Sequence, residues 1–210
     1  MTGAIVTGPA DQDLRRACAD LAQRDGALAK AHTEVGLPNW RATTASYETL
    51  ARIVVYQLIS TKAADAIWGR VKARHAEMTA RCVLDDEEDA LRACGLSRPK
   101  LGHLQAIADA VETGFLDFDA LAEAPIDEAR NVLLKVRGIG PWTAETFLMN
   151  ALGHLDAFPH GDVGLLESYK RLSNAEARLS VKEFSALAEA WRPYRAVAAH
   201  LLYDWLNANR

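Results

Sequence analysis

The segment with the most specific chemical pattern joins two predicted helices and runs from Leu134 to Ala144. Gly138 and Gly140 flank one apolar residue, Ile139, which would be buried between the helices. Glycine reaches positive φ without steric cost and leaves the backbone unshielded. The helix that follows would present free N–H groups and the positive end of its dipole, which suit a phosphate oxygen. A tight helix connection without a ligand is the alternative. The predicted phosphate-binding residues are Gly138, Ile139, Gly140, Trp142 and Thr143.

The same turn could also expose carbonyl oxygens to a cation. We expect a possible structural monovalent cation, Na⁺ or K⁺, at the carbonyls of Leu134, Val136 and Ile139. No side-chain metal site is expected, because the histidines show no metal-ligand spacing and the three cysteines lack a C-x-x-C pair. The sequence therefore predicts no required cofactor.

An acidic residue follows the hairpin by about twenty residues and stands where a helix should begin. The plain interpretation of Asp162 is an N-cap. Free N–H groups and the helix dipole favour the charged carboxylate at such a position. A fixed carboxylate at a cleft can stabilise a developing sugar cation or orient water against it, as glycoside cleavage requires. Asp162 is therefore the candidate catalytic residue as well as a cap.

These residues must be positioned by helices, because apolar residues recur at intervals of three and four along nearly the whole chain. No strand-like alternation of any length is present. The sequence predicts an all-α fold with about ten helices, consisting of two helical lobes with a cleft between them. The predicted helices are Asp11–Leu28, Ser46–Tyr56, Thr61–His75, Lys100–Glu112, Phe115–Ala124, Asp127–Val136, Trp142–Leu152, Val163–Leu172, Val181–Trp191 and Pro193 to about Leu206.

The composition fits a protein of one substantial core or two small lobes, since half of the 210 residues are hydrophobic. The net charge of −4 argues mildly against a nucleic-acid partner, but net charge hides local basic patches. Cys18, Cys82 and Cys94 are predicted to be reduced thiols of a cytoplasmic protein. Met1–Ala10 does not have the pattern of a signal peptide, and no apolar run is long enough for a membrane span.

The chain resembles the helix-hairpin-helix DNA glycosylase superfamily and, within it, the 3-methyladenine DNA glycosylase II (AlkA-like) branch. The resemblance covers roughly Ala42 to Trp205 and is specific in the order and spacing of its motifs. Four groups of residues carry it: Tyr56–Ser60 with Lys62–Ala64, Gly95–Ser97 with Lys100, Arg137–Ala144 with Asp162, and Trp191–Arg195.

The resemblance implies roles for individual side chains. Asp162 falls on the catalytic aspartate of the family, and Gln57 with Leu58 falls on the loop that fills the gap left by a flipped base. Trp142 falls where relatives that also nick the strand carry a lysine nucleophile, and tryptophan cannot form a Schiff base. Tyr203 falls close to an aromatic that stacks on the target base, where cation–π attraction favours a cationic purine. Leu58, Trp142 and Tyr203 could each be core residues instead.

Two positions depart from the family pattern and leave the substrate range open. Tyr56 replaces the second glutamine of a common Gln-Gln pair, and Thr146 stands where some relatives have a pocket aromatic. His160 is close to Asp162 in sequence and receives no proton-transfer role. Basic residues near the motifs are candidate neighbours of DNA phosphates. They are Lys62, Arg98, Lys100, Lys135, Arg137, Arg192 and Arg195.

The predicted lobes are residues 43–154, with the hairpin at about 137–141, and residues 1–42 plus 155–210, with the catalytic aspartate. The resemblance implies a monomeric, monofunctional glycosylase that excises alkylated bases of the 3-methyladenine or 7-methylguanine type from damaged double-stranded DNA. This excision would be a step of base excision repair and would leave an abasic site. The alternatives are a glycosylase of the same fold for a cyclic adduct or an oxidised purine, a non-catalytic helix-hairpin-helix DNA-binding protein, and a helical interaction protein unrelated to DNA.

Overall fold

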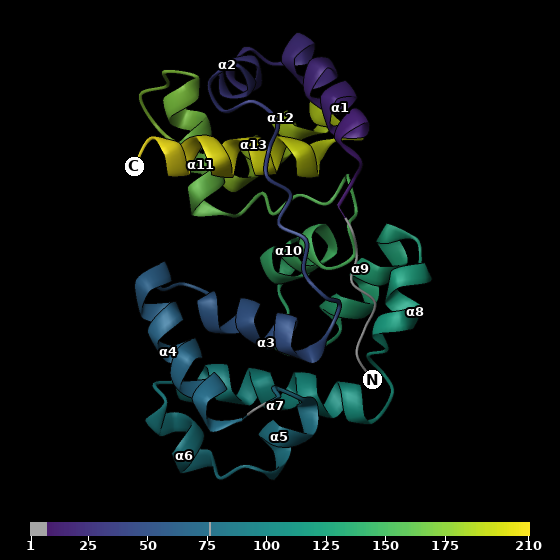
Figure 1. The fold of residues 1–210 in the computed structure, drawn as a ribbon, viewed down its shortest axis with the longest axis vertical. Helices are drawn as coiled ribbons and strands as arrows, with labels where there is room; N and C mark the ends of the chain where they lie inside the picture. The colour runs from purple at the N-terminus through teal and green to yellow at the C-terminus, as the bar shows by residue number, and fades with distance from the viewer. Residues whose placement is uncertain (1–7, 76) are drawn as a thin grey trace. The chain divides into compact units, whose positions relative to one another are not determined.

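The computed structural model describes residues 8–75 and 77–210, and every regular element within them is a helix (Figure 1). The predicted all-α fold is confirmed. None of the described helices is both long and apolar enough to cross a bilayer. The elements are α1 (Asp11–Arg24), α2 (Gly26–Val35), α3 (Tyr47–Tyr56), α4 (Thr61–Arg74), α5 (Ala80–Asp85), α6 (Glu88–Ala93), α7 (Arg98–Glu112), α8 (Phe118–Glu123), α9 (Ile126–Leu134), α10 (Pro141–Asn150), α11 (Val163–Leu172), α12 (Val181–Ala188), the 3₁₀ turn η1 (Glu189–Trp191) and α13 (Arg195–Ala208).

The chain divides into two compact units. The central unit is Thr43–Phe147, and the terminal unit combines residues 8–42 with Leu148–Arg210. The division between them falls inside α10, a few residues before His154, where the sequence placed it. The segment after α10 belongs to the terminal unit because the N–H of Ala196 in α13 donates to the carbonyl of Leu155 at 2.9 Å.

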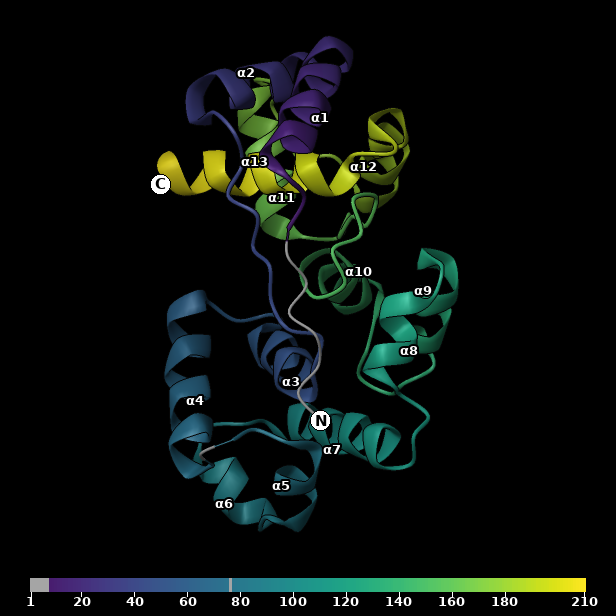
Figure 2. The same ribbon diagram turned by 45° about the vertical axis from the view of Figure 1, so that its right-hand side comes forward.

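The central unit is built around α7, on which α3, α5 and α6 pack (Figures 1 and 2). Leu101, Leu104 and Ile107 recur at helical spacing on one face of α7 and are almost completely buried. The hydroxyl of Tyr47 at the start of α3 donates to the carbonyl of Leu104 at 3.0 Å. This bond fixes the register of α3 on α7, which decides where α3 ends.

The terminal unit is built around α13, which contacts α1, α2, α11 and η1. Most of α13 is buried, including Leu201 and Leu202. Ser168 of α11 donates to the carbonyl of Leu202 at 2.8 Å, which fixes the crossing of these two helices. A helix buried on several sides reads as apolar all round, and this is why its periodicity in the sequence is weak.

The prediction of one helix over Asp11–Leu28 is wrong, because the chain breaks at Asp25. The Asp25 carboxylate caps α2 by accepting the N–H groups of Ala27 and Leu28 at 2.8 and 3.3 Å. Its second oxygen accepts from the Tyr169 hydroxyl at 3.1 Å and the Trp191 indole at 3.0 Å. Two distant aromatic donors thus hold the cap where local propensity alone favours a continuous helix.

Other helix ends differ from the predicted ones by a few residues. Ser97 caps α7 through the Lys100 N–H, so α7 begins at Arg98. Asp117 caps α8, which is shorter than predicted. The last helix begins at Arg195, two residues after its predicted start at Pro193. In each case the side chain or backbone that caps the helix sets its end.

His200 lies in the middle of α13 and is completely buried. Its Nε2 accepts the backbone N–H of Arg41 at 3.2 Å, and its ring lies 4.2 Å from that of Trp40. Burial, together with the nearby Arg41 guanidinium, lowers the pKa of His200 to about 3. The folded protein therefore holds this imidazole neutral, while the unfolded chain protonates it below pH 6.5.

We expect acid to destabilise the protein through His200. Between pH 7 and pH 5 the unfolded chain gains a proton that the folded protein refuses, which costs roughly 2 kcal/mol of the free energy of unfolding. His200→Gln keeps an acceptor for the Arg41 N–H but has no titrating imidazole. Between pH 7 and pH 5 its free energy of unfolding should therefore fall by about 2 kcal/mol less than that of wild type. Urea unfolding of both proteins at the two pH values measures this, and equal losses would contradict it.

Candidate functional site

The hairpin between α9 and α10 has the backbone that its glycines predict. Gly138 has φ +95°, a region that L-residues rarely adopt. The N–H of Ile139 donates to the carbonyl of Val136 at 3.1 Å, and Ile139 is buried, as expected. The turn therefore delivers the chain to Pro141, the first residue of α10, with the first amides of that helix following directly.

The hairpin rests on α7. A Cβ at Gly138 would overlap the Cβ and Cγ of His103, so only glycine fits against this side chain. One residue earlier, the guanidinium of Arg137 reaches Gly102, where a Cβ would lie 3.7 Å from Nη2. At Gly140, by contrast, a Cβ would meet nothing within 4 Å. The two glycines of the motif thus have different roles. Gly138 allows the hairpin to pack against His103, and Gly140 leaves the backbone at the start of α10 uncovered.

Gln57 and Leu58, the loop predicted to fill the gap left by a flipped base, follow α3 directly. This loop is called the wedge loop below, and Leu58 is its wedge. Leu58 has φ +58° and a fully exposed side chain, and the next residue, Ile59, is 38% exposed. A leucine in the left-handed region is strained by about 1–2 kcal/mol, and exposure of its whole side chain gains nothing from the hydrophobic effect. Contacts within the folded protein do not offset the strain and exposure of Leu58. The same geometry is expected of a side chain that inserts into a partner.

Gln57 is engaged inside the protein. Its amide Nε2 donates to the hydroxyl of Thr143 at 2.6 Å and to the carbonyl of Gly138 at 3.3 Å. Gln57 therefore joins the wedge loop to the hairpin, while Leu58 projects. Thr143 is buried with its hydroxyl accepting from Gln57, so its backbone amide is the group it can offer to a phosphate.

Lys100 supports the same loop. Its ammonium donates to the carbonyls of Val55 and Gln57 at 2.7 and 2.8 Å, and burial lowers the pKa of the amine. The last carbonyls of a helix have no partner inside it, and a cation at this end also suits the dipole. Lys100 thus serves the end of α3 instead of standing free as a phosphate neighbour.

Two further predicted phosphate neighbours are held in the terminal unit. Arg195 is almost fully buried and forms a double ion pair with Asp156, with both contacts at 2.9 Å. Arg192 pairs with the same carboxylate and with Glu189. These arginines connect the start of α13 to the segment before α11, which is a structural role.

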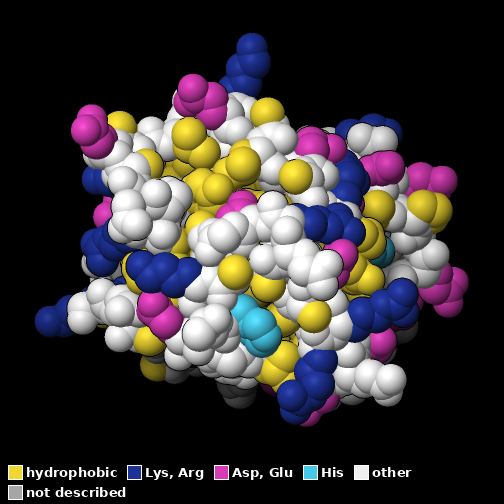
Figure 3. Space-filling view, turned by 90° about the horizontal axis from the view of Figure 1, so that it is seen from above, with side chains coloured by type: hydrophobic (Ala, Val, Ile, Leu, Met, Phe, Trp, Pro, Cys, Tyr) yellow, Lys and Arg dark blue, Asp and Glu magenta, His cyan; other side chains and the backbone are white. Residues whose placement is uncertain are grey.

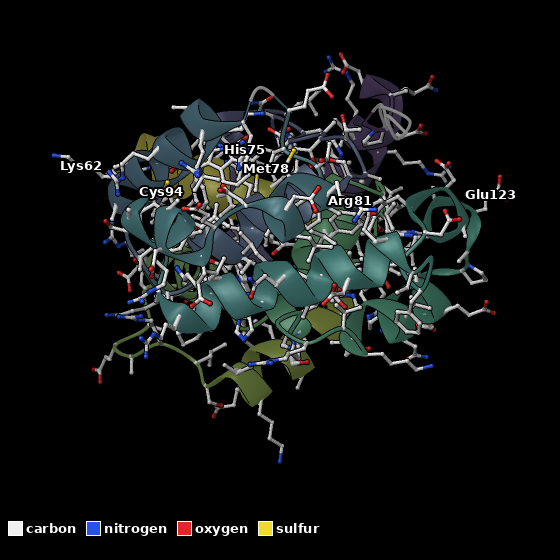
Figure 4. All side chains as sticks on the ribbon, turned by 90° about the horizontal axis from the view of Figure 1, so that it is seen from below. Lys62, His75, Met78, Arg81, Cys94 and Glu123 are labelled. Atoms are coloured by element: carbon white, nitrogen blue, oxygen red, sulfur yellow. The ribbon has the colours of Figure 1, made fainter. Side chains whose placement is uncertain are left out.

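The remaining predicted phosphate neighbours lie in the central unit and are exposed. They form no ion pair with any part of the chain that the structure describes. Figure 4 shows Lys62 projecting from the edge of this unit. On the face in Figure 3, by contrast, basic and acidic side chains are interspersed, which does not concentrate positive potential. The exposed cations are Lys62, Arg98, Lys135 and Arg137.

Asp162 is the N-cap of α11, and its Oδ1 accepts the N–H of Leu165 at 3.0 Å. Tyr203 of α13 is hydrogen-bonded to the same carboxylate. Burial, then the Asp162 carboxylate and the hydrogen bond to it, raise the pKa of Tyr203 well above its usual range. The phenol therefore stays protonated and its hydroxyl donates a hydrogen bond to Asp162, so that the Leu165 N–H and the Tyr203 hydroxyl both orient this carboxylate.

Gly164 leaves room for the carboxylate of Asp162. A Cβ at this position would lie 3.0 Å from the Oδ1 of Asp162 and 3.8 Å from the Cε1 of Tyr203. One face of the Tyr203 ring also lies against the guanidinium of Arg41, 4.8 Å from the ring centroid. A base could therefore stack on the opposite face of the ring at most.

The structure thus brings together the predicted residues within each unit. In the central unit the wedge loop contacts the hairpin, and in the terminal unit Asp162 contacts Tyr203. Trp142 lies in the first turn of α10, where the Thr146 hydroxyl donates to its carbonyl at 2.7 Å. No sequence pattern points to Gly164 or Arg41, since each acts through a contact that periodicity does not record.

No group of three or more His, Cys, Asp or Glu residues suited to a metal ion is found in the part of the chain that the structure describes. At the hairpin the carbonyl of Val136 already accepts the N–H of Ile139. A carbonyl oxygen has a second lone pair, so this bond leaves room for one further contact. The cation at Leu134, Val136 and Ile139 stays a prediction.

Comparison with known proteins places this geometry in a family. The model described as "HhH-GPD superfamily base excision DNA repair protein" matches residues 51–193. DNA-3-methyladenine glycosylase 1 of Schizosaccharomyces pombe is 32% identical over 75% of this chain and 71% of its own length. A Mycobacterium tuberculosis protein named probable bifunctional transcriptional activator/DNA repair enzyme AlkA is 33% identical over 76% of this chain, which spans only 33% of that relative.

Solved structures agree with the sequence matches. The S. pombe 3-methyladenine DNA glycosylase Mag1, in complex with abasic DNA, has a TM-score of 0.80 and 27% identity, covering 89% of this chain and 95% of that one. A Bacillus halodurans DNA-3-methyladenine glycosidase has a TM-score of 0.75 and 32% identity, covering 90% and 88%. The resemblance drawn from the motifs is therefore confirmed.

We expect the two hairpin glycines to respond differently to alanine. Gly138→Ala combines a positive φ with overlap on His103 and should lower the free energy of unfolding by about 3 kcal/mol. Gly140→Ala meets no neighbour and should change it by less than about 0.5 kcal/mol. Urea unfolding of the pair measures both values. Equal effects would mean that His103 moves aside and that the packing does not require glycine.

Proposed function

The chain belongs to the HhH-GPD superfamily of base excision DNA repair proteins, and we propose that it is a monofunctional DNA glycosylase for alkylated bases. It would flip a base of the 3-methyladenine or 7-methylguanine type out of duplex DNA, cleave its N-glycosidic bond and leave an abasic site. The observation that carries the proposal is the Asp162 carboxylate, fixed by the Leu165 N–H and the Tyr203 hydroxyl at the family's aspartate position.

The chemistry requires little beyond this carboxylate. An alkylated purine carries a positive charge, so when the glycosidic bond breaks its electron pair leaves with a neutral base. The sugar becomes an oxocarbenium ion, which the negative charge of Asp162 stabilises. A water oxygen then forms the new bond at the same carbon and releases a proton to solvent or to Asp162. No strong general acid is needed, which fits a site with one aspartate.

The central unit supports the handling of DNA. Leu58 is exposed and would replace the flipped base in the stack, which offsets part of the cost of unstacking. The hairpin would bind a phosphate through the backbone amides of Gly140, Trp142 and Thr143 at the start of α10. Gln57 links these two elements, so the wedge and the phosphate grip keep a fixed spacing.

We propose that the protein has no lyase activity, because Trp142 stands where a lysine would be needed to form a Schiff base. Trp142 and Tyr203 are instead the side chains that we propose as contacts of the flipped base. A monovalent cation at the hairpin carbonyls would hold the turn and leave the chemistry to Asp162. We further propose a cytoplasmic location, since the three cysteines are free thiols and the substrate is chromosomal DNA.

The decisive change is Asp162→Asn. Asparagine is as good an N-cap as aspartate, so the fold of α11 is retained while the charge is lost. We expect wild type to release 3-methyladenine or 7-methylguanine from methylated duplex DNA, and the variant to be slower by at least about 100-fold. The product strand should remain uncut until alkali is added, and borohydride should trap no covalent adduct.

The matched control is Asp117→Asn, which removes the charge from another N-cap aspartate, that of α8, and should leave base release unchanged. Binding of all proteins to duplex DNA with a neutral abasic analogue shows whether the DNA site is intact. A wild type that binds tightly but releases neither base would contradict the proposed substrate, and a panel of cyclic and oxidised adducts would then be tested.

Leu58→Gly separates the function of the wedge from stability. Glycine relieves the positive φ, so the free energy of unfolding should stay within about 1 kcal/mol of wild type, on the stabilising side. Base release from duplex DNA should fall about tenfold, because nothing fills the gap, while release from single-stranded DNA should not change. The control is Ile59→Ala at the neighbouring exposed position. Wild-type release by Leu58→Gly would exclude a wedge role.

A further inference from the structure

The segment before α3 is fastened to α13 by three contacts within the terminal unit. The backbone N–H of Asn39 donates to the Asp204 carboxylate at 2.7 Å, and the Nη2 of Arg41 donates to its other oxygen at 2.8 Å. The backbone N–H of Arg41 donates to the buried His200 at 3.2 Å. Arg41 is therefore held at both its backbone and its side chain.

This fastening places the Arg41 guanidinium over Tyr203, with its carbon 4.8 Å from the ring centroid. Tyr203 and Asp204 are neighbours in α13, so one arginine grips a carboxylate and an aromatic face at once. The Tyr203 hydroxyl in turn is hydrogen-bonded to Asp162. A continuous set of contacts thus runs from Asp204 through Arg41 and Tyr203 to the candidate catalytic carboxylate.

We propose that Arg41 is a positioning residue for Asp162 and acts through Tyr203, an inference that rests on the catalytic role proposed for Asp162. The direction of a phenol hydroxyl is set by the plane of its ring. Arg41 covers one face of the ring. The guanidinium thereby fixes the angle at which the hydroxyl meets the carboxylate.

A positioning role for Arg41 and a contact of Arg41 with DNA phosphate predict different kinetics. The Arg41 side chain is one-third exposed, and its Nη2 is already engaged with Asp204. An arginine that bound phosphate would mainly change affinity for DNA, whereas a positioning residue changes the rate once DNA is bound. The rate at saturating enzyme therefore separates the two.

The test is a double-mutant cycle of Arg41→Gln and Tyr203→Phe, measured as single-turnover base release at saturating enzyme. Arg41→Gln alone should lower the rate about tenfold with little change in the half-saturating concentration. In the Tyr203→Phe background, which lacks the hydroxyl, the same change should have less than about a twofold effect. Arg41→Lys keeps the charge near Asp204 but lacks the planar group that covers the ring, so it should recover only part of the rate.

The matched control is Arg171→Gln. Arg171 pairs with Glu167 within α11 and donates to the carbonyl of Asn209, the residue that follows α13, and it lies at the opposite end of α11 from Asp162. It should leave the rate unchanged. Equal losses from Arg41→Gln in both backgrounds, or a loss confined to the half-saturating concentration, would overturn the positioning role.

A binding measurement keeps the inference separate from the proposed reaction. A duplex with a cationic pyrrolidine in place of the sugar mimics the oxocarbenium charge, and a tetrahydrofuran analogue is its neutral match. We expect wild type to prefer the cationic duplex, and Arg41→Gln and Asp162→Asn each to reduce that preference about tenfold. An unchanged preference in Arg41→Gln would refute the inference, whereas absence of base release with the preference intact would refute the substrate alone.

Discussion

The end of α3 is the constraint on which the rest of the central unit depends. A helix that stops here leaves backbone carbonyls without hydrogen-bond partners. The Lys100 ammonium donates to two of them, the carbonyls of Val55 and Gln57. Because the backbone is held from one side, the Gln57 side chain can reach the hairpin from the other, and Leu58 is left in a strained, exposed position. Three segments far apart in sequence meet at this point, because Lys100 holds the backbone at the end of α3 and the Gln57 side chain connects that backbone to the hairpin.

In the terminal unit a carboxylate, Asp162, satisfies the start of a helix as the Lys100 ammonium satisfies the end of one in the central unit. Asp162 caps α11 through a local hydrogen bond, but a cap alone leaves the carboxylate free to rotate about its side-chain torsions. Tyr203 restricts it from α13, and Gly164 leaves room for the carboxylate itself. Asp25 repeats this arrangement, since it caps α2 and accepts from Tyr169 and Trp191. In both cases a capping aspartate also accepts a hydrogen bond from an aromatic side chain that is distant in sequence.

Local features of the site could be predicted from the sequence, and contacts across the fold could not. Gly138 and Asp162 were recognisable because turn and cap chemistry depend on a few consecutive residues. The helical fold followed from periodicity for the same reason. Lys100 was interpreted as a phosphate neighbour and Asp11–Leu28 as one helix, because nothing nearby in sequence reveals the carbonyls of Val55 or the donors that reach Asp25.

The net charge was misleading for a related reason. Lys100, Arg192 and Arg195 are basic residues near the motifs, yet each is committed to a partner inside its own unit. Acidic residues such as Asp156 likewise form ion pairs with arginines of the same unit. Backbone amides at a helix N-terminus bind an anion whatever the charge of the whole chain, and a few unpaired cations can supply the remainder. An acidic protein can therefore bind DNA, since the charges that count are those left exposed beside the hairpin.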